Sequence, residues 1–146
     1  MARVQFKPRV RTDLIVVHCA ATKPGMDIGL REIRMWHRQR GFLDVGYHLI
    51  IRRDGTVEHG RDIGVIGAHV KGHNSTSVGI CMVGGVDDAM EPQNNFTDAQ
   101  FATLREQLRD LERTYPEARV VGHNELDDGK ACPSFNVQEW LAANPL

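Results

Sequence analysis

Residues 14–20, with the sequence LIVVHCA, form a nearly continuous apolar run that is rich in β-branched side chains. Such a run predicts a strand buried on both faces, because a half-exposed strand would alternate between apolar and polar residues. His18 interrupts the run near its C-terminal end, where α/β sheets place their ligand sites. A buried imidazole there needs a partner. The stretch therefore predicts both a central strand and a candidate functional residue.

Further elements are predicted around this strand. They are an amphipathic helix in residues 28–42, a hairpin in 47–61, a buried strand in 78–85, a long helix after the Thr97/Gln100 capping box, a short strand in 118–123 and a final helix capped by Asn136. Asp54-Gly55 favours a two-residue turn in the hairpin. Strands and helices alternate irregularly, which predicts a single α/β domain over residues 1–146, with a central mixed β-sheet flanked by helices.

The composition excludes several classes of protein. The 146 residues include 41% apolar and 25% charged residues, and 18 Lys plus Arg against 19 Asp plus Glu give a net charge of -1. This balance argues against direct nucleic-acid binding by bulk electrostatics. The sequence shows no apolar run near the ~20 residues of a membrane span and no signal-peptide core at the N-terminus, so we expect a cytoplasmic protein without membrane insertion. Three cysteines make a disulfide framework unlikely in this compartment.

Residues 120–135, VVGHNELDDGKACPSF, bring further candidate ligands. His123 ends a predicted strand, so it can lie beside His18, and Cys132 precedes Pro133, which favours an extended backbone. Two imidazoles and a thiolate fill three positions of tetrahedral zinc and leave the fourth for water. A closed structural site would need a fourth protein ligand, and the sequence has no CxxC pair to supply one. Spacing alone leaves two interpretations open, an open zinc site and three unrelated side chains.

Lys130 lies two residues before Cys132, so both side chains can face one cleft if the segment is extended. The lysine could stabilise negative charge that develops beside a metal, or it could be a solvated surface residue. A phosphate-binding loop is excluded, because six residues rather than four separate Gly122 from Gly129 and no Ser or Thr follows the lysine.

Two further segments carry candidates. Tyr47 begins the hairpin strand, where it either packs or orients a nucleophile. His69 and Asn74 lie in a glycine-containing loop before a buried strand, the kind of segment where binding groups concentrate. His37 and His59 are assigned to surface or packing roles.

Several blocks of the chain resemble one known family, the zinc-dependent N-acetylmuramoyl-L-alanine amidases, which share their fold with animal peptidoglycan recognition proteins. The blocks are VVHCAATKP, IRMWHRQRGFLDVGYHLIIRRDGTVEHGR, GAHVKGHNSTSVGICMVGG, NFTDAQ and KACPSF. The resemblance implies one Zn²⁺ per chain held by His18, His123 and Cys132. It also implies catalytic roles for Tyr47 and Lys130. By the same resemblance His69 is a groove residue near the metal.

The implied reaction is hydrolysis of the amide between N-acetylmuramic acid and L-alanine in peptidoglycan, by a phage endolysin that lyses the host. Such an enzyme would act as a monomer and reach the wall after a separate protein opens the membrane. The alternative is a peptidoglycan-binding module without activity, but binding-only proteins of this fold lose the cysteine ligand, and Cys132 is present here. By the same resemblance, which extends to the N-terminal residues MARVQFK, a second role is implied, the inhibition of a phage single-subunit RNA polymerase.

Overall fold

Strand β1 (Leu14–Cys19) lies inside a five-stranded sheet, where it pairs in parallel with β4 (Ser77–Met82) and β5 (Arg119–Gly122). The computed structural model describes residues 6–146, and its strand order is β3-β2-β4-β1-β5. β2 (Leu49–Ile51) is parallel to β4, and β3 (Val57–His59) is antiparallel to β2. The predicted mixed sheet is therefore confirmed.

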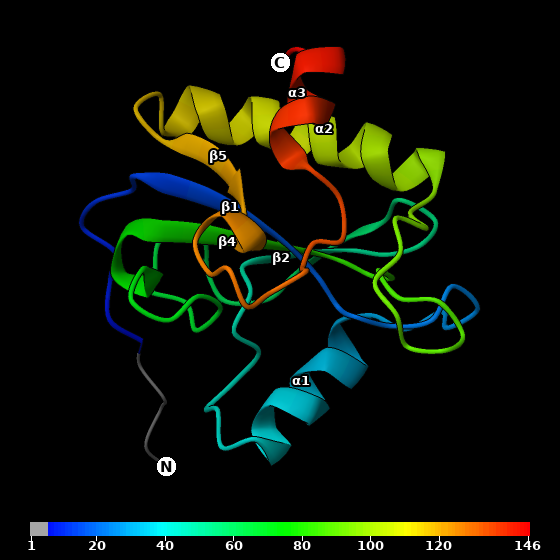
Figure 1. The fold of residues 1–146 in the computed structure, drawn as a ribbon. Coiled ribbons are helices and arrows are strands. Elements are labelled where there is room, and N and C mark those ends of the chain that lie inside the picture. Colours follow the sequence, from blue (N-terminus) through cyan, green and yellow to red (C-terminus); the bar gives the residue numbers. More distant parts are fainter. Residues whose placement is uncertain (1–5) are drawn as a thin grey trace.

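Helices cover both faces of this sheet (Figure 1). α2 (Asp98–Thr114) and α3 (Val137–Ala143) lie on one face, and α1 (Leu30–Gln39) lies on the other. Two short 3-10 turns, η1 (Asn74–Thr76) and η2 (His123–Glu125), precede β4 and follow β5. The predicted cap of α2 is present, since the Thr97 hydroxyl accepts from the Gln100 backbone and the Gln100 side chain accepts from the Thr97 backbone.

Burial on both faces of β1 explains its apolar sequence. Ile15, Val16 and Val17 are each 0% exposed. Because side chains alternate along a strand, Ile15 and Val17 face α2, while Val16 and His18 face the side that carries α1. The predicted strand is confirmed, and its alternation places His18 on the sheet face opposite to the main core.

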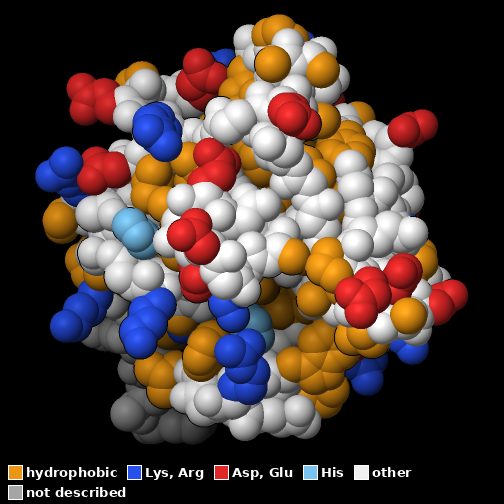
Figure 2. Space-filling view, in the orientation of Figure 1, with side chains coloured by type: hydrophobic (Ala, Val, Ile, Leu, Met, Phe, Trp, Pro, Cys, Tyr) orange, Lys and Arg blue, Asp and Glu red, His pale blue; other side chains and the backbone are white. Residues whose placement is uncertain are grey.

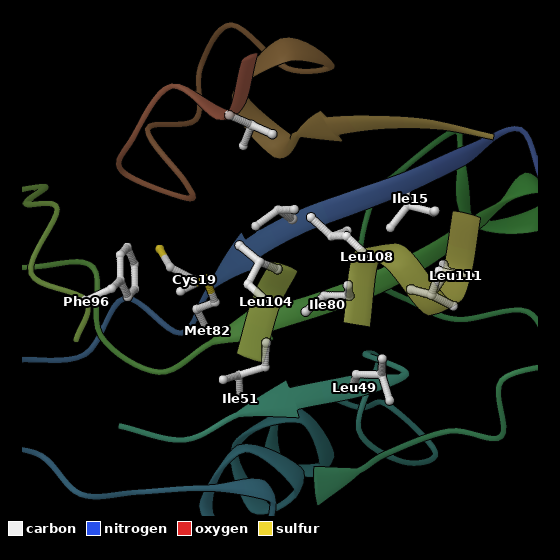
Figure 3. Packing of buried hydrophobic residues seen from close by; sticks show 13 residues of the cluster. Ile15, Cys19, Leu49, Ile51, Ile80, Met82, Phe96, Leu104, Leu108 and Leu111 are labelled. Atoms are coloured by element: carbon white, nitrogen blue, oxygen red, sulfur yellow. The ribbon is translucent and has the colours of Figure 1, made fainter. Parts of the chain in front are cut away.

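The main core fills the space between the sheet and α2. Leu104, Leu108 and Leu111 point from α2 towards the sheet, where Ile15, Ile80 and Met82 meet them (Figure 3). Their spacing of four and three residues keeps them on one face of the helix. The sheet is therefore held mainly from the side that does not carry His18.

The hairpin formed by β2 and β3 confirms the predicted pairing but not the predicted turn. The Gly55 N–H donates to the Arg52 carbonyl at 2.9 Å, so Arg53 and Asp54 are the central residues of the turn. Gly55 follows with φ 88°, and it is the residue of this turn with a positive φ. The two-residue Asp54-Gly55 turn is wrong because it would also require positive φ at Asp54, which glycine adopts far more easily.

The surface carries charges of both signs. On the face drawn in Figure 2, acidic and basic side chains are interspersed with apolar ones, and neither sign forms a continuous field. In the described part of the chain, no helix is long and apolar enough to cross a membrane.

We predict that Leu108→Ala lowers the free energy of unfolding by about 2–5 kcal/mol, because the truncation leaves a cavity in a site that is 0% exposed. Urea denaturation measures the change. Arg109→Ala, on the exposed side of the same helix, is the matched control and should change it by about 0.5 kcal/mol or less. Equal losses in both variants would contradict the assigned core.

Candidate metal centre

The register of two parallel strands brings two histidines together. Val17 is opposite Gly122 in the last residue pair between β1 and β5. The next residues along the two strands are His18 and His123, and their ring centroids are 4.7 Å apart. The prediction that two strand-end histidines lie side by side is therefore confirmed.

Cys132 joins the histidines from the segment that follows η2. The Asn124 N–H donates to the Cys132 carbonyl at 2.8 Å, which closes the loop between them. β5 pairs with β1 only as far as Val17, so no β5 residue lies beside Cys19. The backbone N–H of Cys19 donates instead to Cys132 Sγ at 3.0 Å. This contact fixes the sulfur 3.9 Å from Nδ1 of His18.

Donor atoms of His18, His123 and Cys132 all lie within 4.8 Å of one another, the one such His/Cys/Asp/Glu group of three found among residues 6–146. Tetrahedral zinc with bonds of about 2.0 Å to nitrogen and about 2.3 Å to sulfur separates these atoms by about 3.6 Å. The measured 3.9 Å between sulfur and imidazole is close to this value. The residues therefore fit a zinc ion with three protein ligands.

The two imidazoles are in the protonation state that metal binding requires. Burial lowers the pKa of His18 well below its ordinary value. Burial also lowers the pKa of His123, and the nearby Lys130 ammonium lowers it further, against an opposing effect of Asp127. Neutral imidazoles expose a lone pair at neutral pH, and this lone pair is the metal ligand.

The thiols of Cys132 and Cys19 change each other's pKa. Hydrogen bonding with the Cys19 thiol, together with burial, raises the pKa of Cys132. The same contact lowers the pKa of Cys19 to about 7. Cys132 also accepts the backbone N–H, a hydrogen bond that favours its thiolate. A cation bound among the three donors would favour that thiolate further and would displace the proton of Cys132.

Tyr47 lies against the same group. Its ring centroid is 5.1 Å from that of His18 and 5.3 Å from that of His37 on α1. Burial raises the pKa of Tyr47 well above its ordinary value, and a hydrogen bond to the Cys81 sulfur contributes. The phenol thus keeps its proton at neutral pH. It can serve as a hydrogen-bonding group but is a poor base.

Lys130 is exposed and lies near the metal ligands, as its effect on the pKa of His123 shows. The backbone between Asp127 and Lys130 is a turn, closed by a hydrogen bond of 3.1 Å from the Lys130 N–H to the Asp127 carbonyl. This turn precedes the segment from Lys130 to Cys132, whose expected extended backbone stays a prediction, and Lys130 lies beside the site.

The loop before β4 places His69 and Asn74 differently from one another. The His69 ring reaches the site, with Nδ1 2.8 Å from Nε2 of His18. The Asn74 side chain instead accepts from the backbone N–H groups of His69 and Val70, both at 2.9 Å. Substrate binding by these two residues stays a prediction.

His37 is buried, with Nδ1 accepting from the Gly46 N–H at 2.8 Å, and His59 is exposed, in agreement with their packing and surface roles.

Sequence reasoning missed the contributions of Cys19 and Ser77. Cys19 acts through its backbone N–H, and the signal that could have found it is the short length of the 118–123 strand. The Ser77 hydroxyl lies 3.2 Å from Nε2 of His69. No sequence pattern indicates that contact, because it depends on how the preceding loop folds back.

The chain is similar to known proteins over most of its length. Residues 8–135 match the family model described as N-acetylmuramoyl-L-alanine amidase. The endolysin of Escherichia phage T7 is 53% identical over 146 residues, which cover 100% of this chain and 96% of that protein.

Solved structures agree. The endolysin and N-acetylmuramoyl-L-alanine amidase LysCS of Clostridium intestinale aligns with a TM-score of 0.82 at 25% identity, over 96% of this chain and 88% of that one. PGRP-SA of the bumblebee shares the fold, with a TM-score of 0.75 at 22% identity over 99% of this chain and 90% of that one. The family match, the sequence identity and the fold together confirm the resemblance, and the chain therefore belongs to the N-acetylmuramoyl-L-alanine amidases.

Proposed function

We propose that the protein is a zinc-dependent phage endolysin that hydrolyses the amide between N-acetylmuramic acid and L-alanine in peptidoglycan. The observation that carries this proposal is the convergence of His18, His123 and Cys132, with Tyr47 and Lys130 beside them. Zinc in such a three-ligand site supplies a Lewis acid, which makes water acidic enough to act as a nucleophile near neutral pH.

Lys130 has the charge that the transition state needs. Addition of water to the amide carbonyl carbon places negative charge on the carbonyl oxygen. An ammonium near His123 stabilises that oxygen more than it stabilises the neutral substrate, so its effect appears in the rate. This role explains a lysine beside metal ligands, where it would repel the cation and contribute nothing to binding it.

Tyr47 has a different task. Because burial raises the pKa of Tyr47, its phenol keeps its proton, and the oxygen lone pairs can accept a hydrogen bond from the attacking water. Packing against His18 and His37 holds the ring in place. Tyr47 therefore orients the nucleophile and is not its general base.

The alternative, a binding module without activity, is disfavoured by the same residues. Recognition of the wall alone needs no thiolate ligand, no buried phenol and no adjacent ammonium. In this protein Cys132, Tyr47 and Lys130 all lie around the candidate metal site. A module that only bound the wall would not need these groups.

Two finer statements rest on the resemblance. We propose that the protein acts as a monomer, is made in the host cytoplasm and reaches the wall after a separate protein opens the inner membrane. Inhibition of a phage single-subunit RNA polymerase stays a prediction, because most of the MARVQFK segment falls in residues 1–5, outside the described part of the chain.

We predict about one zinc ion per chain and loss of activity after treatment with a chelator, because the three donors leave one tetrahedral position open. Cys132→Ser should retain less zinc and lose wall cleavage. Cys81→Ser is the control for zinc retention, since it also removes a buried thiol but no ligand. Elemental analysis and a wall-digestion assay measure both effects. An active protein without metal would refute the zinc assignment.

We predict that digestion of peptidoglycan releases new L-alanine amino termini and no new reducing sugar ends. Hydrolysis of a glycosidic bond normally needs a pair of carboxylates around the bond. The side chains that converge at the candidate metal site are two histidines and a cysteine, with no Asp or Glu among them. Labelling of amino groups and a reducing-sugar assay on one digest distinguish the two reactions. Reducing ends without amino groups would contradict the amidase reaction.

We predict that Lys130→Ala lowers kcat by about 10²- to 10³-fold, the usual loss when one preorganised charge-stabilising group is removed. Its KM and zinc content should change far less. Tyr47→Phe keeps the ring and removes the hydroxyl, so it should lower kcat while zinc stays bound. Lys7→Ala removes another exposed lysine and serves as the control. Wild-type turnover by Lys130→Ala would show that the lysine is only a surface charge.

A further inference from the structure

A series of hydrogen bonds connects His18 with His69, Ser77 and the His73 carbonyl. Nε2 of His18 lies 2.8 Å from Nδ1 of His69, and Nε2 of His69 lies 3.2 Å from the Ser77 hydroxyl. That hydroxyl donates to the His73 carbonyl at 2.8 Å. The two imidazole rings meet edge to face, at an interplanar angle of 87°. One ring of the metal site is thus hydrogen-bonded to a second histidine.

The hydrogen bond from Ser77 to the His73 carbonyl determines the direction of the other hydrogen bonds in this series. A carbonyl oxygen can only accept, so the proton of Ser77 points to His73 and the Ser77 oxygen accepts from Nε2–H of His69. A neutral His69 with its proton on Nε2 has a lone pair on Nδ1. His18 must then carry its proton on Nε2, which leaves the lone pair on its Nδ1, the nitrogen that faces Cys132 Sγ at 3.9 Å.

The surroundings of His69 hold its ring in this position. A Cβ atom at Gly79, in the middle of β4, would lie 2.6 Å from the His69 ring, so the ring occupies space that only a glycine leaves free. The Asn74 side chain accepts from the backbone N–H groups of His69 and Val70 and fixes the backbone of the loop. Both contacts constrain the ring from sides that do not involve His18.

We propose that His69 is a positioning residue that acts through His18: its Nδ1 accepts the Nε2 proton of His18 and so presents Nδ1 of His18 to the metal. Outer hydrogen bonds of this kind set the tautomer and the ring orientation of a ligand, and their loss typically costs about 10- to 100-fold in metal affinity. This inference rests on the proposed zinc site. It gives His69 a role in metal binding that is separate from contact with the substrate.

The test measures zinc affinity by competition with a chromophoric chelator, so it does not depend on activity. Leucine and asparagine have the same branched shape, but only asparagine can place an acceptor oxygen near the position of Nδ1. We expect His69→Leu to weaken zinc binding about 10- to 100-fold. His69→Asn should restore most of the affinity, and His59→Leu, at an exposed position, should leave it unchanged.

A second measurement keeps the inference testable if His69→Leu folds poorly. Nitrogen NMR of the zinc-loaded wild-type protein should find both His18 and His69 protonated on Nε2. A proton on Nδ1 of His69, or zinc affinity in a folded His69→Leu equal to that of the wild type, would overturn the inference and leave the zinc site intact. A wild-type protein that binds no zinc would overturn both the inference and the proposed function.

Discussion

The parallel register between β1 and β5 is the constraint on which the site depends. Val17 opposite Gly122 places His18 and His123 at neighbouring positions where β5 ends. Side chains alternate along a strand, so a slip of one residue would turn one imidazole to the opposite face of the sheet. The apolar residues of β1 resist such a slip because they are buried on both faces. The packing that stabilises the fold therefore also sets the geometry of the donors.

The shortness of β5 gives the site its third candidate ligand, Cys132. Had β5 continued, its backbone would have paired with the N–H of Cys19. Because it ends at Gly122, that N–H binds the sulfur of Cys132 instead. An interior strand thus acquires an open edge over a short distance, and the loop that covers this edge carries a ligand. α2 packs on the sheet face opposite to His18, whereas Cys132 also packs against this main core.

Much of this arrangement could be predicted from the sequence, because apolar periodicity reports burial and alternation. The run at residues 14–20 predicted a central strand, and the Thr97/Gln100 pair predicted a helix start, both correctly. Contacts made by loops were harder to predict from the sequence. The turn at Gly55 and the path of the chain from Asp127 to Lys130 depend on backbone angles that residue type only biases. The bond from His69 to His18 joins residues 51 positions apart, and no local pattern encodes it.

The choice of a histidine as the partner of His18 has an electrostatic consequence. Ligand imidazoles commonly donate their second N–H to a carboxylate, which would add a negative charge next to the metal. The three donors already include one thiolate, so a carboxylate partner would balance both charges of a divalent cation. His69 is neutral, because burial lowers its pKa to about 3, and it accepts the hydrogen bond without adding charge. With the proposed zinc ion bound, the site would then keep one net positive charge. In the proposed reaction, with Lys130 nearby, that charge would favour a transition state in which the amide oxygen becomes negative.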